Sequence, residues 1–253
     1  MTKTELKSFL DEKAAFYENP EFLETDPIQI PHTFTRKEDI EISGFLTATI
    51  AWGNRKSIIN NAQKMMRFLD QAPYDFVMNH KDKDLLALQS FVHRTFNGDD
   101  FSFFIKGLHH IYKEYGGLEN VFKSHQSKTS LQPAISQLKL LFFEPEHLSR
   151  TQKHVSDPAK GSAAKRINMF LRWMIRPNTK GVDFGLWDIP TAKLSCPLDV
   201  HSGNVARKLK LLKRKQNDAK ALQELDTSLQ KLDPIDPVKY DFSLFGLGVF
   251  ESF

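Results

Sequence analysis

Two short stretches of the sequence carry residues whose types could do chemistry, one around Lys165 and one around Asp199. Lys165 follows the small-residue turn 161–164 and would lie in the first turn of a helix if Ser162 is its N-cap. The positive end of the helix dipole and the adjacent Arg166 both disfavour a protonated amine, and burial would lower the pKa of Lys165 further. An unprotonated lysine amine is a nucleophile, and this is the chemistry we expect of it. The alternative is a solvated lysine on a helix surface.

An aspartate stands directly before another predicted helix, in the segment 197–201. Asp199 in this position would cap the helix, and the capping amides would keep its carboxylate ionised. Such a carboxylate can stabilise positive charge that develops on a sugar, or manage the protons of a nearby amine. We expect the neighbouring His201 to be structural or to contact phosphate. The alternative is that Asp199 serves only as a helix cap.

Positive charge is concentrated in two tracts, although the net charge of the chain is only +4. The stretches 160–180 and 200–217 each contain six lysines or arginines and no acidic residue. Local basic tracts favour a polyanionic partner. The backbone amides of the turn that contains Lys160, Gly161 and Ser162 would add a phosphate-binding site at the start of a helix. The alternative is that both tracts are solvated helix faces.

Apolar residues recur at helical spacing along most of the chain, and no stretch shows sustained two-residue alternation. The predicted fold is therefore all-α. Gly53 and Pro177 are expected to end helices. Residues 178–197 contain several glycines and prolines and are expected to form an irregular connection. Asp236 followed by Pro237 predicts the start of a last helix.

The composition of the 253 residues is that of a globular protein, with 40% hydrophobic and 26% charged residues. The single cysteine, Cys196, excludes a disulfide framework, a zinc knuckle or an iron–sulfur cluster within one chain, and we expect no cofactor and no metal. The N-terminal segment lacks the apolar stretch of a signal peptide. No segment approaches the roughly 20 consecutive apolar residues of a membrane span. We therefore expect a cytoplasmic protein that does not bind membranes.

The segments around Lys165 and Asp199 together resemble the helix-hairpin-helix DNA glycosylase superfamily. Residues 197–207 are similar to the segment that carries the catalytic aspartate of that superfamily, and residues 165–174 are similar to the helix that follows its catalytic lysine. Asp199 follows Lys165 by 34 positions, which resembles the archaeal 8-oxoguanine glycosylase branch with its insertion between the two residues. The hairpin has one glycine, Gly161, where the usual motif has two.

This resemblance implies a DNA-repair glycosylase, with AP lyase activity, in which Lys165 and Asp199 are catalytic. Its partner would be double-stranded DNA with a damaged base, by resemblance an oxidised purine. The resemblance also implies two helical lobes on either side of a cleft, one formed by residues 34–177 and ending in the hairpin, the other by residues 1–33 with 198–253. Because a base inside the stacked duplex cannot be attacked, the cleft would receive a flipped nucleotide. We expect a monomer associated with the nucleoid.

Further site residues follow from the same resemblance. In the 8-oxoguanine glycosylases an asparagine-rich turn enters the duplex and fills the gap left by the flipped base. Asn54 is the matching residue here, and Arg55 would hold the base that has lost its partner. Trp52, Trp173 and Trp187 are the candidate walls of the base pocket. The residues expected to contact DNA are Asn54, Arg55, Lys56, Lys160, Gly161, Ser162, Arg166, His201 and Arg207. The alternatives are a tight interhelical turn at Asn54 and core positions for the three tryptophans.

The whole chain also resembles a bacterial family of unknown function. The hallmarks of that family are found at residues 51–55, 172–177, 182–187, 197–209 and 236–241. This second resemblance implies no activity. Two alternatives to a glycosylase stay open. One is a non-catalytic DNA- or RNA-binding helical protein, which needs the basic tracts but no reactive lysine. The other is a metal-dependent phosphohydrolase, which the absence of a His-Asp dipeptide disfavours.

Overall fold

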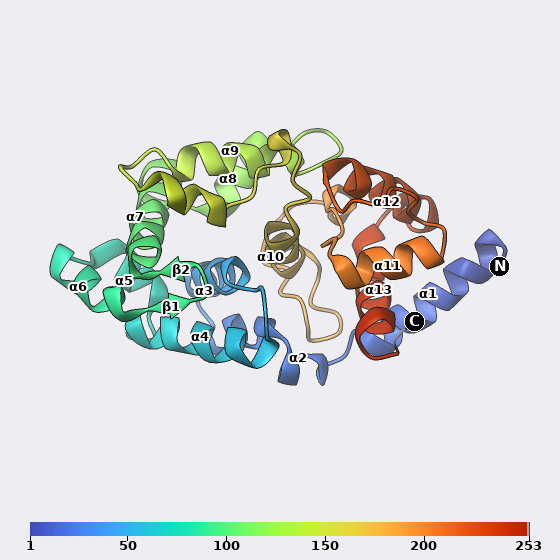
Figure 1. Ribbon diagram of the computed structural model, residues 1–253, viewed down its shortest axis with the longest axis horizontal. Coiled ribbons are helices and arrows are strands. Elements are labelled where there is room, and N and C mark those ends of the chain that lie inside the picture. Colours follow the sequence, from blue (N-terminus) through green and yellow to red (C-terminus); the bar gives the residue numbers. More distant parts are fainter. Residues whose placement is uncertain (252) are drawn as a thin grey trace. The chain divides into compact units, whose positions relative to one another are not determined.

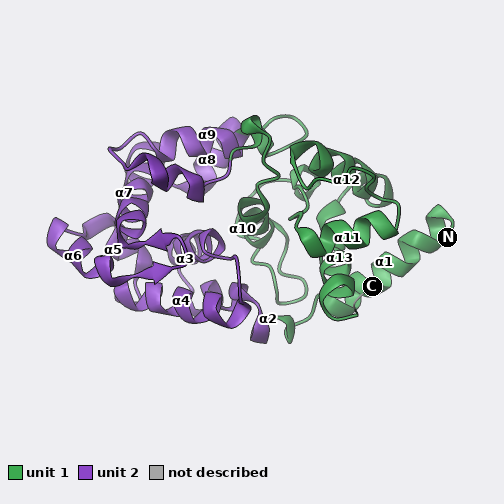
Figure 2. Cartoon of the chain, in the orientation of Figure 1, with its two compact units in different colours: residues 1–22, 126–133, 157–253 green, residues 23–125, 134–156 purple. Residues whose placement is uncertain are grey.

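The protein is a mostly helical molecule, which this computed structural model divides into two compact units (Figures 1 and 2). The structure describes residues 1–251 and 253. Unit 1 contains residues 1–22, 126–133 and 157–253, and unit 2 contains residues 23–125 and 134–156. The prediction of a helical fold is confirmed.

Unit 1 is built from the N-terminal helix and the C-terminal part of the chain. Its elements are α1 (Lys3–Tyr17), the 3₁₀ turn η5 (Pro158–Lys160), α10 (Lys165–Ile175), η6 (Thr191–Lys193), α11 (Val200–Lys208), α12 (Ala219–Leu232), η7 (Pro237–Lys239) and α13 (Tyr240–Val249). Helix α13 packs against both α1 and α11. Leucines of α1, α12 and α13 meet Val205 and Cys196 in the core of this unit. The core therefore surrounds the segment 196–198, which leads into α11.

The packing of α1 against α13 depends on the glycine at position 246. A Cβ atom on Gly246 would lie 2.2 Å from Cδ2 of the Tyr17 ring. Because packed interiors leave no room for such an overlap, any side chain there would push the two helices apart. Tyr17 also stacks on Phe250, with ring centroids 5.7 Å apart, and its hydroxyl donates a 2.5 Å hydrogen bond to Glu251. These contacts join the two ends of the chain.

Unit 2 consists of shorter helices around an aromatic core. Its elements are η1 (Pro27–Gln29), η2 (Pro31–Thr33), α3 (Lys37–Thr49), α4 (Arg55–Phe68), α5 (Pro73–Asn79), α6 (Asp82–Ala87), η3 (Leu88–Ser90), β1 (Val92–His93), β2 (Phe96–Asn97), α7 (Gly98–Tyr115), α8 (Leu118–His125) and η4 (Ser149–His154). Two further helices, α2 (Phe22–Thr25) and α9 (Gln132–Phe142), cross the boundary between the units. In the core, the ring of Phe104 lies 5.2 Å from that of Phe96 and 5.0 Å from that of Phe142.

One small hairpin departs from the all-helical prediction. Strands β1 and β2 pair antiparallel, with Val92 opposite Asn97 and His93 opposite Phe96. Arg94 in the turn adopts a φ of +55°, in the left-handed region. Each strand is only two residues long, so no periodic pattern could have revealed it in the sequence.

The units differ in extent from the lobes expected from the sequence. Residues 157–177 belong to unit 1, together with the irregular connection and the C-terminal helices. The lobe 34–177 expected from the sequence instead places residues 157–177 apart from the C-terminal helices. The physical reason lies in two buried arginines, one in α10 and one directly after it. Arg172 binds Asp241, and Arg176 binds Asp236, so this helix is held by acids of the C-terminal segment.

The last helix begins later than the sequence predicts. Pro237 opens the 3₁₀ turn η7, and α13 starts at Tyr240. Asp236 makes no cap, because its carboxylate accepts hydrogen bonds from Arg176 Nε at 3.1 Å and Nη2 at 2.9 Å. Among the described residues, none of the helices combines the length and the apolar character that crossing a bilayer requires.

Candidate active site

Lys165 is the first residue of α10, a helix whose residues from Ile167 to Ile175 are all buried. The residue before it, Ala164, takes a left-handed conformation with a φ of +45° and makes no side-chain cap. The sequence offers Ser162 as a possible N-cap, but Ser162 does not cap the helix. Its hydroxyl instead accepts a hydrogen bond from the Ala164 amide at 3.1 Å, within the turn that precedes the helix. Lys165 nevertheless occupies the first turn, as expected.

The turn at Gly161 uses its amides within the protein. Gly161 N donates to Pro158 O at 2.9 Å, and Ser162 N donates to Asp157 O at 3.2 Å. Gly161 O in turn accepts from Ala219 N, which joins the turn to the start of α12. The amides of Gly161 and Ser162 are therefore occupied within the protein and are not free to bind a phosphate. The element before Gly161 is the 3₁₀ turn η5 rather than an α-helix.

Asp199 is the N-cap of α11, as the sequence predicts, and its two carboxylate oxygens have different partners. Oδ1 accepts the Ser202 amide at 3.0 Å and the Ser202 hydroxyl at 3.2 Å, while the Asp199 amide donates to that hydroxyl at 2.9 Å. The reciprocal bonds form a capping box. Asn217 holds the backbone carbonyl of Asp199 at 2.8 Å. The cap thus fixes the side chain through Oδ1 and leaves Oδ2 to face Lys165.

Unit 1 brings Lys165 and Asp199 together. Lys165 Nζ lies 3.9 Å from Asp199 Oδ2, and the two side chains are 29% and 26% exposed. The amine also lies 3.7 Å from the sulfur of Met169, one turn further along α10. Partial exposure matters here because a substrate atom has to reach both groups. A small movement of either side chain would shorten the 3.9 Å separation to a hydrogen bond, through which a proton can pass from the amine to the carboxylate.

A buried thiol and a buried carboxyl lie near the pair. Cys196 Sγ is 3.7 Å from Asp241 Oδ1, and Asp241 Oδ2 accepts a 2.6 Å hydrogen bond from Arg172. Burial raises the pKa of Asp241, and the charge of Asp199 raises it further, while Arg172 opposes the shift. Burial also raises the pKa of the Cys196 thiol well above its usual value. Cys196 is therefore an unreactive core residue rather than a nucleophile.

A second buried arginine, Arg176, is the C-cap residue directly after α10. Asp183 accepts from Arg172 Nε at 3.2 Å and from Arg176 Nη1 at 2.6 Å, so one carboxylate bridges both guanidinium groups. Arg176 also binds Glu18 at 2.7 Å. Burial alone would lower the pKa of Arg176, but Asp183 and the other carboxylates outweigh this effect and raise the pKa above its usual value. This network was missed from the sequence, where two arginines at i and i+4 on an apolar helix were its only signal.

The basic tract after α11 forms an ordered loop. Arg207 was predicted to contact DNA, but its guanidinium donates to Arg214 O at 2.8 Å and to Asn217 Oδ1 at 2.6 Å. Glu224 accepts the amides of Lys213 and Arg214 at 2.7 and 3.2 Å. Arg207 therefore shapes the loop from within. The exposed lysines in and beside this loop are Lys208, Lys210, Lys213 and Lys215.

The other predicted DNA contacts of unit 1 differ in exposure. Lys160 and His201 are exposed, whereas Arg166 is half-buried. Burial lowers the pKa of Arg166 to about 10. Two predicted pocket walls lie in the core, since Trp173 is fully buried and Trp187 is only 3% exposed. Neither tryptophan offers an open face to an entering base, which contradicts their predicted role.

Trp52, Asn54, Arg55 and Lys56 belong to unit 2. Asn54 is the N-cap of α4, where its side chain accepts the Ser57 amide at 3.1 Å. Trp52 is half-buried and stacks on His154, with ring centroids 6.0 Å apart. Lys56 is exposed and Arg55 half-buried. Asn54 thus has a structural role in a rigid interhelical turn.

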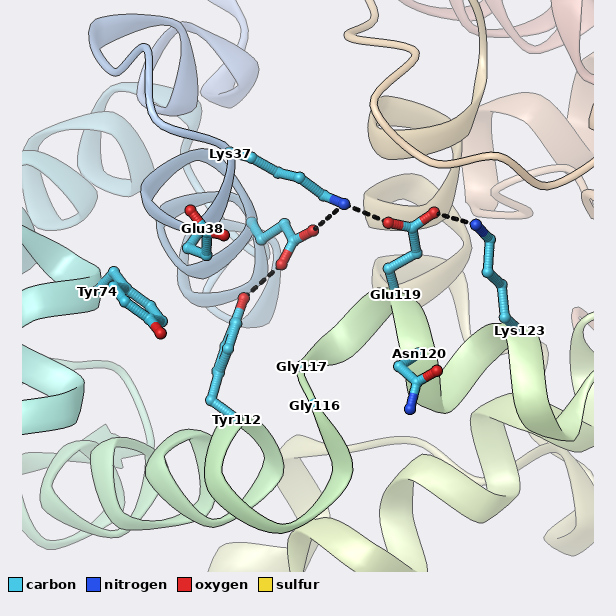
Figure 3. Close-up of a pocket in the computed structure, with 10 residues that line it drawn as sticks. Lys37, Glu38, Tyr74, Tyr112, Gly116, Gly117, Glu119, Asn120 and Lys123 are labelled. Atoms are coloured by element: carbon cyan, nitrogen blue, oxygen red, sulfur yellow. Dashed lines mark hydrogen bonds and ion pairs between the residues drawn. The ribbon is translucent and has the colours of Figure 1, made fainter.

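A separate cavity of about 420 Å³ lies in unit 2 and is lined by several charged side chains. Figure 3 shows Glu119 between Lys37 and Lys123, with ion pairs to both. The Tyr112 hydroxyl donates a 2.5 Å hydrogen bond to the buried Glu41, and burial raises the pKa of Tyr112 well above its usual value. The lining contains two lysines, Lys37 and Lys123, and three glutamates, Glu38, Glu41 and Glu119, so its formal charge is −1.

The chain belongs to a family described as a protein of unknown function (DUF2400), which matches residues 26–250. The predicted membership of a family of unknown function is thereby confirmed. The match includes nearly all of unit 2 and the segments that carry Lys165 and Asp199. No curated protein and no solved structure matches the chain. The family description assigns no activity, so a function has to be argued from the geometry of the site.

Proposed function

We propose that the protein is a DNA N-glycosylase with AP lyase activity, in which Lys165 is the nucleophile and Asp199 assists it. The observation that carries the proposal is the 3.9 Å separation between the Lys165 amine and the Asp199 carboxylate, both of which are partly exposed. The resemblance of residues 165–174 and 197–207 to helix-hairpin-helix glycosylases supports the same assignment. The substrate is double-stranded DNA with a damaged base.

The chemistry begins with the transfer of a proton from Lys165 to Asp199. The free amine attacks C1′ of a flipped nucleotide, the N-glycosidic bond breaks, and the base departs with the bonding electron pair and takes up a proton. The attached nitrogen then loses a proton to Asp199 and its lone pair expels O4′. The same proton passes to O4′ as the ring opens, and a protonated Schiff base joins Nζ to C1′. Loss of a C2′ proton expels the 3′ phosphate, and water releases the amine.

Asp199 has two tasks in this sequence. It accepts the proton that Lys165 loses and passes it to the departing base, and the carboxylate that this regenerates stabilises the positive charge of the sugar adduct. Its Oδ1 is held by Ser202, so Oδ2 stays in place while the proton moves. The exposed lysines of the 208–215 loop supply the attraction to phosphate, which requires no particular base sequence.

Incision of a panel of duplexes, each with one oxidised purine, one uracil or one abasic site, tests the proposal. Lys165→Arg keeps the positive charge but removes the nucleophile, so cleavage should be lost while DNA binding remains. Asp199→Asn keeps an N-cap oxygen, so the fold should be retained and the rate should fall by about 10² or more. Lys231→Ala, at an exposed position of α12 with no predicted DNA contact, is the matched control and should cleave at the wild-type rate. Binding without cleavage of any duplex would favour the non-catalytic alternative.

A further inference from the structure

A cavity of about 440 Å³ in unit 1 lies apart from the candidate active site. One wall is a face of α12, and the other is formed by the loops 129–133 and 193–195 with Pro158. Neither Lys165 nor Asp199 is among the described residues that line it. The volume falls in the range of small-molecule sites, roughly 300–1,000 Å³.

The face of α12 that lines this cavity is polar but almost uncharged. Gln223, Asp226, Thr227 and Gln230 follow one another at helical spacing, so their side chains share one face. Leu222 and, from the opposite loop, Pro133 add apolar surface. On an ordinary amphipathic helix the polar face is turned to water. Here the segments 129–133 and 193–195 lie opposite this face, and the partly open cavity between them is lined by amides and hydroxyls.

Asp226 is the single carboxyl group of the lining. It accepts the Cys196 amide at 2.9 Å and a hydrogen bond from the Ser195 hydroxyl. An ionised carboxylate can accept about four hydrogen bonds, so about two positions stay open to a ligand. Lys193 also lines the cavity, but its ammonium donates to Gln126 at 2.8 Å. Among the described residues, no lysine or arginine forms an ion pair with Asp226.

Burial raises the pKa of Asp226 to about 7, although the hydrogen bonds from Cys196 and Ser195 oppose the shift. A carboxyl group in this state weakens the fold whenever it is ionised. Groups of this kind in a cavity are characteristic of binding sites, where a ligand supplies the missing partner.

We propose that this cavity binds a small planar molecule that presents two parallel N–H donors to Asp226, as guanine does with N1 and its 2-amino group. Paired donors match the geometry of a carboxylate. Apolar surface from Leu222 and Pro133 suits the faces of a flat ring, and the neutral amides and hydroxyls suit a ribose. The ammonium of Lys193 in the same lining repels a cation, which favours a neutral guanine nucleoside over a cationic guanidinium. This site is independent of Lys165 and of the proposed glycosylase reaction.

Isothermal titration of the full-length protein with guanosine, inosine and agmatine tests the proposal. Inosine lacks the 2-amino donor, so it should bind about tenfold more weakly than guanosine. Agmatine carries the same donor pair on a cation and should bind more weakly than guanosine. No binding of guanosine at millimolar concentration, equal binding of inosine, or tighter binding of agmatine would overturn the proposal.

Variants locate the site. Asp226→Asn should weaken guanosine binding at least tenfold, and Asp188→Asn, an exposed aspartate outside the cavity, should leave it unchanged. Thr227→Trp, at an exposed position of the lining, should block the cavity without disturbing the core. Unchanged guanosine binding in both cavity variants would contradict the assignment. Lys165→Arg should bind guanosine as the wild type does, because Lys165 does not line the cavity. Guanosine binding and DNA cleavage therefore test the two proposals separately.

Discussion

Arg172 Nη1 donates a 2.6 Å hydrogen bond to Asp241 Oδ2, and both side chains are buried. Arg172 lies two turns after Lys165 on α10, so the helix that presents the candidate nucleophile is anchored by this ion pair. The ring of Phe242 lies 4.3 Å from the Arg172 guanidinium and adds a cation–π contact. The position of the Lys165 amine is thus determined by contacts deep in unit 1.

Removal of one member of the buried network should be costly. Asp183→Asn leaves Arg172 and Arg176 without the carboxylate that bridges them. We expect the free energy of unfolding to fall by about 3–5 kcal/mol, because uncompensated charges remain buried. Urea unfolding measures this change. Asp75→Asn, which breaks the exposed pair with Arg36, should cost less than about 1 kcal/mol, and equal losses in the two variants would contradict the account.

Asp226 should make stability depend on pH. Burial raises its pKa from 3.8 to about 7 in the folded protein, so the folded state binds the proton more tightly than the unfolded state does. The contribution of this group to stability is therefore complete below pH 3.8 and is lost as the pH rises through 7. Wild type should lose up to about 4 kcal/mol relative to Asp226→Asn between pH 4 and pH 8. Urea unfolding at each pH gives the free energy of unfolding of the two proteins. If this free energy changed with pH in the same way for both, the predicted contribution of Asp226 would be contradicted.

The ordered basic loop should control the salt dependence of DNA binding. Lys210, Lys213 and Lys215 are exposed, while Arg207 and Glu224 hold the loop backbone. Replacement of the three lysines by alanine should reduce the slope of log K against log salt concentration by up to about 2.7, at about 0.9 for each lost phosphate contact. Fluorescence anisotropy measures the slope when binding is titrated at salt concentrations between about 50 and 200 mM.

The control for this measurement is the triple replacement of Lys3, Lys7 and Lys13, which lie on α1. It removes the same charge from another part of the surface. A similar reduction of the slope in both triple variants would show that binding follows net charge rather than the loop.

The sequence predicts those parts of the site that depend on local structure. Asp199 is identified as a helix cap because an N-cap is set by neighbouring residues, and Lys165 is placed correctly in a first turn for the same reason. Ser162 does not cap α10, because its neighbour Gly161 pairs with the start of α12, which lies far along the chain.

Long-range ion pairs were not predictable from local pattern. Asp236 has the sequence of a helix cap, yet Arg176 binds its carboxylate. Arg172 and Asp183 are recognisable as residues of a family motif, but their pairing depends on how the irregular connection folds back on α10. The cavity at Asp226 arises in the same way, because segments far apart in the sequence lie opposite a polar face of α12.

Covalent trapping tests the central claim most directly. The protein is incubated with a duplex that contains an abasic site or an oxidised purine, in the presence of borohydride, and the adduct is digested and analysed by mass spectrometry. The account predicts a reduced Schiff base on the peptide that carries Lys165, and no adduct in Lys165→Arg. An adduct of undiminished yield in Lys165→Arg, or one on another lysine, would contradict it.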